Sequence, residues 1–441
     1  MTGIRKTVVV AIVAGLGVML MAGAVTPAHA QEAGKQGYTM PEYNAYVEAR
    51  DEKNAAAQLR KLDDFVQKFP NSQLLTYIYE LYYQNYYATK NFVKVLEYVD
   101  KLLALGDKAD PMMRYRAYYA RALAYNNLPS PTADQAAKAR DAAIAGLQAL
   151  DAIKRPDNVD EKTFEEQVRR PALITFNYTA AAAAAAAKDF PTAIKYYRAT
   201  LVLTPDQAVT WFRLGVAYLS STPPQQLDGF WALAHAVALK GQTEAQVKKY
   251  LRGQMLNYQQ LGCESLVDAE MNELVALAAS STDRPDSYKL PSAADLEAAR
   301  KDMTIASVIA DLKGGGEKGK VTWLAACGLE FPEVPGKLME APTGEEPVVL
   351  QIAFVTNDEE FQNAKTPDMD VKVVGQPEAA RIEKDSQVGF TGTLVGFDTN
   401  PAFLLHWDKA KVNPQFIPTE KKAPPKKAPP KKAPAKKQPG A

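Results

Sequence analysis

The sequence predicts an α + β multidomain protein in which an N-terminal α-solenoid of helix hairpins precedes a small all-β domain. Two observations support this prediction: residues 40–280 place apolar residues at helical spacing almost throughout, and short β-branched runs separated by proline and glycine follow residue 320. The two ends of the 441-residue chain differ from both patterns. We therefore expect a signal peptide over 1–30, a helical repeat domain over 31–280, a linker and connecting helix over 281–320, a β domain over 321–420 and a Lys/Pro-rich tail over 421–441.

The first 30 residues have the pattern of an export signal. Arg5 and Lys6 precede an uncharged apolar run over residues 7–25, and small residues allow cleavage between Ala30 and Gln31. We expect an exported protein, periplasmic or extracellular. The apolar run is also long enough for a membrane anchor, which is the alternative if the signal is not cleaved.

Two adjacent segments carry one helix-hairpin signature, with a period of 34 residues when the units begin at Ile174 and Ala208. The first unit closes with Ala193, Tyr197 and Pro205. The second unit opens with Trp211, Leu214, Gly215 and Tyr218. These four residues fall at i, i+3, i+4 and i+7, so they share one helical face. We expect Gly215 to mark a close approach of a second helix, and Pro205 to end the preceding helix.

The period and the signature resemble the tetratricopeptide repeat (TPR) family, most closely over residues 174–240. The resemblance implies stacked hairpins whose first helices line a groove for a protein or peptide, with groove positions at Tyr178, Phe212, Val216 and Leu219. Some members hold a terminal carboxylate there with lysines and asparagines. Phe212 and Val216 replace those residues, so an apolar or aromatic groove is implied instead. Two alternatives stay open: these side chains pack against the next hairpin, or the helices form an ordinary bundle.

An earlier stretch is rich in tyrosine, with six tyrosines between residues 77 and 87. Tyr79, Tyr82 and Tyr83 occupy first-helix positions of an earlier hairpin. Because six residues in eleven cannot all face one core stripe, we expect some of these side chains to form part of a binding surface. The alanine run 180–187 indicates close helix packing, and two helices over residues 246–279 are expected to cap the stack.

After residue 280 the pattern changes. A polar linker over 281–291 precedes a capping-box start at Ser292 and Asp295 for a helix reaching about Leu312, and glycines then break that helix. We expect five strands: Val321–Ala325, Val348–Val355, Asp370–Val374, Val388–Phe397 and Ala402–Trp407. Glycines inside the fourth strand suggest tight bends, hence a small OB-like barrel or a sandwich.

Few residues carry the pattern of a catalytic or metal site. Residues 314–320 spell G-x-x-x-x-G-K, but Val321 follows where a hydroxyl is needed, and we expect a helix before and a strand after, so nucleotide binding is not expected. His235 and His406, the two histidines after the signal, lack metal-ligand spacing. We interpret His235 as a core or surface residue. An enzyme with His406 as a base oriented by Asp408 is conceivable, but no nucleophile motif accompanies it.

The charges and cysteines are unevenly placed. The tail holds eight lysines and no acids; without these and Arg5 and Lys6, 42 basic residues stand against 51 acidic ones. We expect a flexible basic arm that docks on anionic cell-envelope polymer or lipid headgroups, least on nucleic acid, or that merely solubilises the chain. Cys263 and Cys327 fall in different expected domains, so unpaired buried thiols are favoured over one disulfide.

These expectations favour an exported, non-enzymatic scaffold or adaptor. Its groove would bind a protein or peptide partner, and Lys421–Lys437 would add weak attachment to the envelope. The alternative is oligosaccharide binding by the β domain, with the helices as a spacer. No cofactor and no metal are expected.

Overall fold

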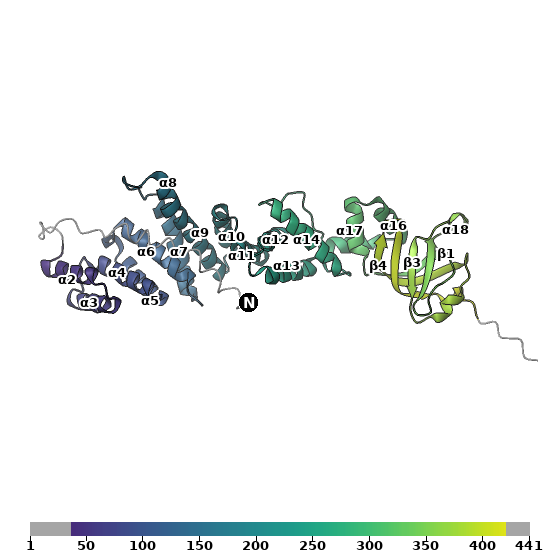
Figure 1. Ribbon diagram of the computed structural model, residues 1–441, viewed down its shortest axis with the longest axis horizontal. Helices are drawn as coiled ribbons and strands as arrows, with labels where there is room; N and C mark the ends of the chain where they lie inside the picture. Colours follow the sequence, from purple (N-terminus) through teal and green to yellow (C-terminus); the bar gives the residue numbers. More distant parts are fainter. Residues whose placement is uncertain (1–36, 420–441) are drawn as a thin grey trace, which may run out of the picture. The chain divides into compact units, whose positions relative to one another are not determined.

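The computed structural model describes residues 37–419, which form two compact units (Figure 1). The first unit comprises residues 37–257 and 268–290, and the second comprises 258–267 and 291–419. The first is helical and the second combines helices with five strands, so the predicted α + β layout is confirmed. The expected signal with its cleavage site at Ala30 and Gln31, and the tail from Lys421, lie outside the described residues.

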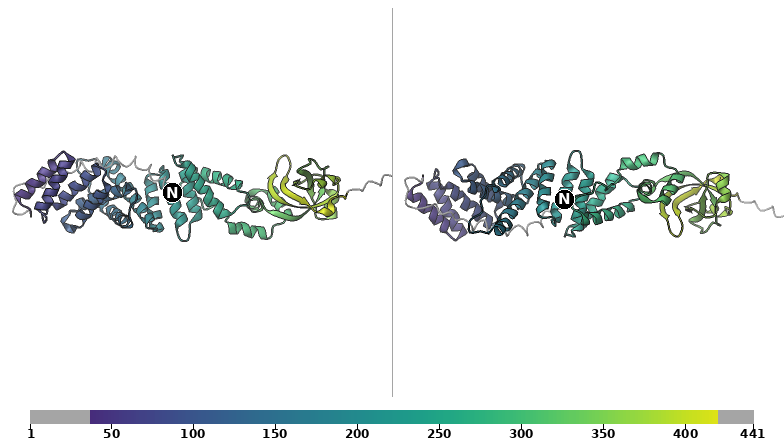
Figure 2. Two further views of the ribbon diagram at one scale, coloured as in Figure 1. Left: turned by 90° about the horizontal axis from the view of Figure 1, so that it is seen from below. Right: turned by 90° about the horizontal axis from the view of Figure 1, so that it is seen from above.

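Helices follow one another throughout the first unit, as the helical pattern over 40–280 predicts. They are α2 (Met40–Asp51), α3 (Ala55–Lys68), α4 (Leu75–Ala88), α5 (Phe92–Leu103), α6 (Pro111–Asn126), α7 (Ala133–Leu150), α8 (Glu161–Phe164), α9 (Arg170–Ala186), α10 (Phe190–Leu203), α11 (Ala208–Ser220), α12 (Gln226–Ala238), α13 (Glu244–Gln259) and α14 (Ser265–Ser280). Short 3₁₀ and π turns, Gly106–Lys108 and Glu165–Arg169, join α5 to α6 and α8 to α9. Neighbouring helices pack on each other from α2 to α7 and from α9 to α12, and α7 packs on α9 (Figure 2).

The same turn closes two of the hairpins. Lys90 after α4 and Lys188 after α9 take the left-handed conformation, with φ of 58° and 62°. The next residue in each case, Asn91 or Asp189, caps the following helix through its side chain. The backbone N–H of that residue also donates to a carbonyl five residues earlier. The local sequences Lys-Asn-Phe and Lys-Asp-Phe therefore encode one recurring hairpin turn.

Glycine sets the distance between α11 and α12. A side chain at Gly215 would meet Leu233 Cγ at 2.7 Å and the Gly229 carbonyl oxygen at 3.0 Å. A side chain at Gly229 would in turn meet Leu219 and the Gly215 carbonyl oxygen of α11. The predicted close approach at Gly215 is confirmed. Helix α10 ends at Leu203, before Pro205, also as expected. Ala180, Ala181, Ala183 and Ala184 of the alanine run are buried in α9, which confirms close packing over this part of the run.

The second unit contains a closed five-stranded barrel. Its helices are α15 (Ala293–Lys301), α16 (Ile305–Gly314), α17 (Gly316–Ala326) and α18 (Asp358–Asn363), with 3₁₀ turns η5 (Pro377–Arg381) and η6 (Pro414–Phe416). Its strands are β1 (Glu330–Leu338), β2 (Val348–Phe354), β3 (Met369–Val373), β4 (Gln387–Asp398) and β5 (Leu404–Val412). The strand order is β1-β2-β3-β5-β4, with β4 pairing back to β1; β3 and β5 run parallel and the other pairs antiparallel. Trp407, Phe390 and aliphatic residues fill the interior.

The first predicted strand is wrong. Residues 321–325 lie in helix α17, which begins at Gly316; Gly315 and Gly316 both have φ near 65°. Asp311 stabilises the first turns of α17, because its carboxylate forms an ion pair with Lys318 and accepts a hydrogen bond from the Thr322 hydroxyl. A short apolar run fits a strand or a buried helix equally well, and here a contact with the preceding helix decides.

The true first strand, β1, was not predicted. It contains Pro332 and Pro335, which cannot donate to a strand ladder and so argue against a strand. Its pairing with β4 shifts between Phe331 and Val334, where Glu333 has a φ of 54°, so the strand accommodates the prolines with a bulge. The other four strands lie near their expected positions, although β5 starts at Leu404 and continues to Val412.

The connecting helix is divided in two. The capping box of Ser292 and Asp295 is confirmed, but α15 ends at Lys301, and a second capping box at Thr304 and Ser307 starts α16. No helix between residues 37 and 419 combines the length and hydropathy needed to cross a bilayer.

The two cysteines form a disulfide, contrary to the expectation of free thiols. Cys263 lies in the loop before α14, and Cys327 follows α17; their Cα atoms are 5.6 Å apart. The expectation was wrong because residues 258–267 belong to the second unit, so both cysteines lie in the same unit. Gly262 contacts the backbone at Cys327 so closely that a Cβ would meet its carbonyl oxygen at 2.4 Å.

Candidate functional site

Three of the predicted groove residues lie half-buried on α11. Phe212 stands edge-on to Tyr250 of α13, with 5.9 Å between ring centroids. Leu219 covers Gly229 of α12. Val216 lies one turn after Phe212 and is also half-buried. Packing against the next helices therefore uses part of these side chains, and a remaining part faces solvent.

Three predicted groove tyrosines belong to the core. Tyr82 and Tyr83 are each only 1 % exposed and Tyr178 is buried, so they offer no surface to a partner. Tyr82 stacks on Tyr98 of α5 at 4.0 Å, whereas Tyr79 stays half-buried at the edge of the same cluster, 6.2 Å from Tyr98. Of the predicted tyrosines, only Tyr79 remains a surface candidate.

Hydrogen bonds to carboxylates hold two buried tyrosines of α4 in place. The Tyr83 hydroxyl donates to Glu80 Oε1 at 3.1 Å, and Glu80 also accepts two hydrogen bonds from Arg116, at 2.6 and 3.1 Å. Tyr82 donates to Asp63. Burial raises the pKa of the Tyr83 hydroxyl well above its ordinary value, so the group stays a neutral donor. Tyr83 thus adds a third hydrogen bond to the buried Glu80 carboxylate, and Tyr82 bonds to the exposed Asp63.

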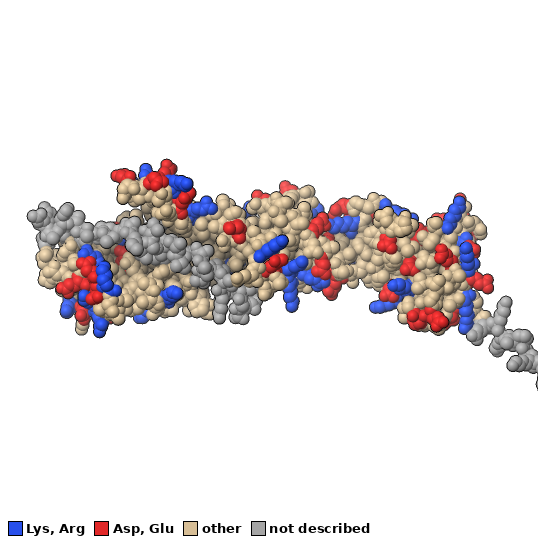
Figure 3. Space-filling view, viewed as in Figure 1, with Lys and Arg blue, Asp and Glu red and all other residues tan. Residues whose placement is uncertain are grey.

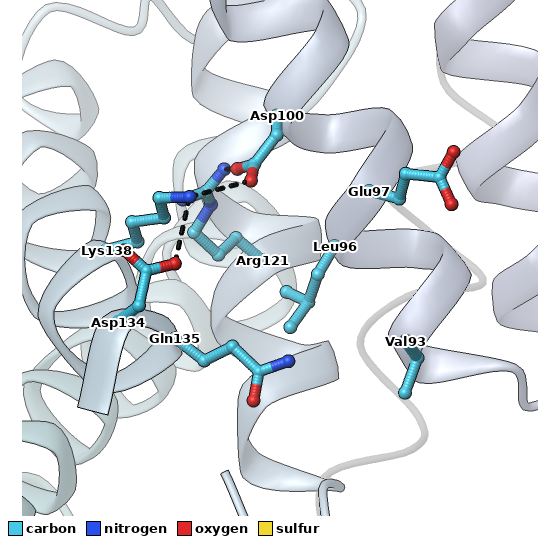
Figure 4. A pocket seen from close by; sticks show the side chains of 8 residues that line it. All are labelled: Val93, Leu96, Glu97, Asp100, Arg121, Asp134, Gln135 and Lys138. Atoms are coloured by element: carbon cyan, nitrogen blue, oxygen red, sulfur yellow. Dashed lines mark hydrogen bonds and ion pairs between the residues drawn. The ribbon is translucent and has the colours of Figure 1, made fainter. Parts of the chain in front are cut away.

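A pocket of about 280 Å³ opens between α5, α6 and α7 (Figure 4). It is lined by Val93, Leu96, Glu97, Asp100, Arg121, Asp134, Gln135 and Lys138. An ion-pair chain crosses its inner wall: Asp100 binds Arg121 and, at 3.1 Å, Lys138, which also lies 3.0 Å from Asp134.

The pocket combines an apolar rim with a polar floor. Val93 is 61 % exposed although it is aliphatic, and Arg121 is only 5 % exposed. Arg121 Nε is buried and has no hydrogen-bond partner among residues 37–419. The pocket therefore offers an aliphatic contact at Val93 beside ion-paired charged groups. Sequence analysis did not identify it, because its residues come from three helices and form no local motif.

On the barrel, His406 belongs to a row of polar side chains. Strand register places Gln351 of β2 beside Asp370 of β3, and Asp370 beside His406 of β5. Gln351 donates to Asp370 at 2.8 Å, and His406 Nδ1 lies 3.5 Å from the same carboxylate. His406 Nε2 lies 2.8 Å from Asp398 of β4. The alternative weighed from sequence, in which Asp408 orients His406, does not match the geometry, because the carboxylates beside His406 are those of Asp370 and Asp398.

His235 is a core residue, one of the two positions that the sequence left open. Its ring stacks on Trp211 at 4.1 Å, and Nε2 lies 3.1 Å from the Thr282 carbonyl oxygen. Burial lowers the pKa of His235 below its ordinary value. Within the described part of the chain, no three His, Cys, Asp or Glu residues are grouped to hold a metal ion.

We expected a strand after the G-x-x-x-x-G-K segment. The segment instead runs into helix α17. Gly319 lies inside that helix and packs against the Asp311 carbonyl oxygen, while Lys318 pairs with the Asp311 carboxylate at 2.7 Å. The motif residues therefore serve the α16–α17 contact and do not form an open loop around a phosphate site.

Comparison of the chain with protein-family models, with curated proteins and with solved structures finds no match. The functional argument therefore depends on the chain's own geometry.

Proposed function

We propose that this protein is an exported, non-enzymatic adaptor whose helical unit binds a segment of a protein or peptide partner. The pocket between α5, α6 and α7 is the observation that carries the proposal. At about 280 Å³ it is the size of an anchoring side chain, and it offers an aliphatic contact at Val93 beside the ion pairs of Asp100, Arg121 and Lys138. The ion pairs that form its wall are made within the chain, so it is ready to bind without rearrangement.

Two further features support a repeat scaffold of the tetratricopeptide kind, an α-solenoid. Consecutive helices pack in order along the first unit, and α4–α5 and α9–α10 share one turn. The half-buried faces of Phe212, Val216 and Leu219 extend the proposed contact surface along α11. On the visible face in Figure 3, acidic and basic side chains intermingle over the helices, which favours a mixed polar rim around apolar contacts.

Export fits the cysteine chemistry. A disulfide persists in oxidising compartments outside the cytoplasm, and the chain's only two cysteines form one. The pattern of residues 1–30 points to the same compartment. The lysines of Lys421–Lys437 would then attach the adaptor weakly to anionic envelope polymer, in a salt-sensitive way.

Site-specific photo-crosslinking tests the pocket. A photoreactive phenylalanine derivative replaces Val93 at the pocket rim or, as a control, Val202 on α10, which is 82 % exposed and does not line the pocket. We expect protein adducts in the native host from position 93 and not from position 202. Val93→Asp should lower capture of the same partner by about tenfold, whereas Val202→Asp should not. Identical adducts from both positions would reject the pocket as the binding site.

The barrel supports a second candidate function, binding of an oligosaccharide. Its strand order, with β3 parallel to β5, supports an OB-like barrel, a fold that binds extended ligands across its strands. The polar row of Gln351, Asp370 and His406 can exchange hydrogen bonds with hydroxyl groups. Phe397 and Phe403 lie near its end, 6.4 Å apart, and offer ring faces.

Two carboxylate variants of the full-length protein separate this function from a structural role of the row. We expect Asp370→Asn to weaken oligosaccharide binding on a glycan array by about tenfold, because it removes a charged acceptor. Asp408→Asn, a carboxylate outside the row, should leave binding unchanged. Full-length protein is needed because a fragment from residue 290 lacks Cys263. Equal loss in both variants, or no glycan bound by the wild type, would exclude this function.

A further inference from the structure

The loop between α13 and α14 belongs to a different unit from most of the two helices that carry it. Residues 258–267 are part of the second unit, whereas the rest of α13 and the rest of α14 are part of the first. The chain therefore passes between the units three times, at residues 257–258, 267–268 and 290–291. Two of these three passages exist because this loop associates with the second unit.

Within the second unit, the loop meets the segment that joins α17 to β1. A Cβ on Gly262 would lie 2.4 Å from the Cys327 carbonyl oxygen, and a Cβ on Gly328 would lie 2.7 Å from the Gly262 carbonyl carbon. Gly328 is itself fixed to the barrel, because its N–H donates to the Leu394 carbonyl oxygen of β4 at 2.7 Å. The loop is thus held against a rigid part of the barrel, backbone against backbone.

The turn of the loop contributes little side-chain packing to this contact. Among residues 260–264, only Leu261 is buried, at 8 % exposed, while Gln260 and Glu264 are exposed. A single buried leucine and two glycines form a small contact compared with a core residue's usual neighbours. The Cys263–Cys327 disulfide adds a covalent attachment at the same place. We therefore expect the covalent bond to hold the loop more strongly than its packing does.

The two sulfurs differ in their access to a reductant. Cys263 is half-buried in the loop, whereas Cys327 is only 1 % exposed. A thiolate of a dithiol reductant therefore attacks Cys263 Sγ, which breaks the S–S bond and releases Cys327 as a thiolate. The second thiol of the reductant then displaces Cys263 from the mixed disulfide. The reductant leaves as a disulfide, and its two protons and two electrons end on the two cysteines.

We propose that the Cys263–Cys327 bond is a redox-sensitive latch that holds the α13–α14 loop on the second unit. Reduction by a dithiol frees the loop, and the passage at residues 290–291 then becomes the sole chain connection between the two units. An oxidising compartment keeps the latch closed. The latch goes beyond the adaptor function, because a reductant acts on the attachment of the units and leaves the pocket between α5, α6 and α7 unchanged.

Hydrogen exchange followed by mass spectrometry tests the latch in the full-length protein. Exchange times of seconds to minutes report local opening, before global unfolding contributes. We expect peptides covering residues 258–267 to exchange about tenfold faster after reduction with dithiothreitol than in the oxidised protein. Peptides containing Gly328 and Leu394 should stay protected, because the hydrogen bonds of these two residues belong to the barrel.

Two variants separate the bond from the packing of the loop. Cys263→Ser lacks the bond, so its loop should exchange at the rate of the reduced wild type, with or without dithiothreitol. Leu261→Ala keeps the bond and loses the buried leucine, so its loop should stay near the oxidised wild-type rate until dithiothreitol is added. If Cys263→Ser does not fold, the wild type and Leu261→Ala, each oxidised and reduced, carry the comparison.

Relaxation of backbone amide signals in NMR measures the consequence for the two units. We expect the rotational correlation time of the β3 and β5 amides to fall by about 1.5-fold on reduction, since a unit attached by a single linker tumbles partly on its own. The same amides in Leu261→Ala, kept oxidised, should have the wild-type correlation time.

Three results would overturn the inference. Exchange of residues 258–267 that does not change on reduction would show that packing alone holds the loop. Exchange in oxidised Leu261→Ala as fast as in the reduced wild type would show the same. Faster loop exchange with an unchanged correlation time would reject the role of the bond in attaching the units. None of these results depends on adducts at position 93, so the latch and the adaptor function fail independently.

Discussion

Replacing Gly215 with alanine should lower the free energy of unfolding of the helical unit by about 1–3 kcal/mol. A Cβ at this position would lie 2.7 Å from Leu233 Cγ and 3.0 Å from the Gly229 carbonyl oxygen. Leu233 is completely buried and the other contact is backbone, so neither can yield without moving α12. Denaturant unfolding followed by tryptophan fluorescence measures the effect, because Trp211 and Trp231 lie on the two helices concerned.

Gly253 provides the matched control for this prediction. It lies inside α13, and a Cβ there would meet nothing within 4 Å. Gly253→Ala should therefore stabilise the unit by about 0.5–1 kcal/mol, since alanine restricts the unfolded chain and favours helix. If Gly215→Ala were stabilising too, helix propensity would outweigh the contact, and the close approach of α11 and α12 would not be a packing constraint.

The fold could be predicted from sequence where the signal is local. The pattern around Trp211 and Gly215 predicted a hairpin with a close helix contact, because the spacing of side chains on one helix also fixes its packing face. Predictions were wrong where the structure depends on residues that are distant in the sequence. The run at residues 321–325 reads as a strand until Asp311 is placed beside it, and β1 is hidden by Pro332 and Pro335, which only a bulge reconciles with the barrel.

For the candidate sites, too, sequence reasoning missed what depends on contacts between distant residues. Sequence reasoning selected Tyr82, Tyr83 and Tyr178 as surface residues, because helical spacing does not reveal which neighbouring helix covers a side chain. The disulfide was missed for a related reason: Cys263 follows helices of the first unit in sequence, yet its loop belongs to the second.

Removing the disulfide should destabilise the second unit by about 2–4 kcal/mol. The bond joins residues 64 apart, so it removes a large loop-closure entropy from the unfolded chain. Cys327 is only 1 % exposed, and the loop bearing Cys263 otherwise contacts the unit through the close backbone approach of Gly262 and Gly328. The double variant Cys263→Ala/Cys327→Ala should therefore unfold at lower denaturant concentration, measured by the fluorescence of Trp323 and Trp407 in this unit.

A reducing agent distinguishes loss of the crosslink from loss of packing at the two cysteines. Reductant should shift the unfolding midpoint of the wild type toward that of the double variant and leave the variant unchanged, because only the wild type has a bond to break. The single variant Cys263→Ala should behave as the double variant does, since one alanine already prevents the bond. If reductant left the wild type unmoved while the variants were destabilised, the cysteines would act by packing alone. The cysteine chemistry would then give no support to the proposed oxidising compartment.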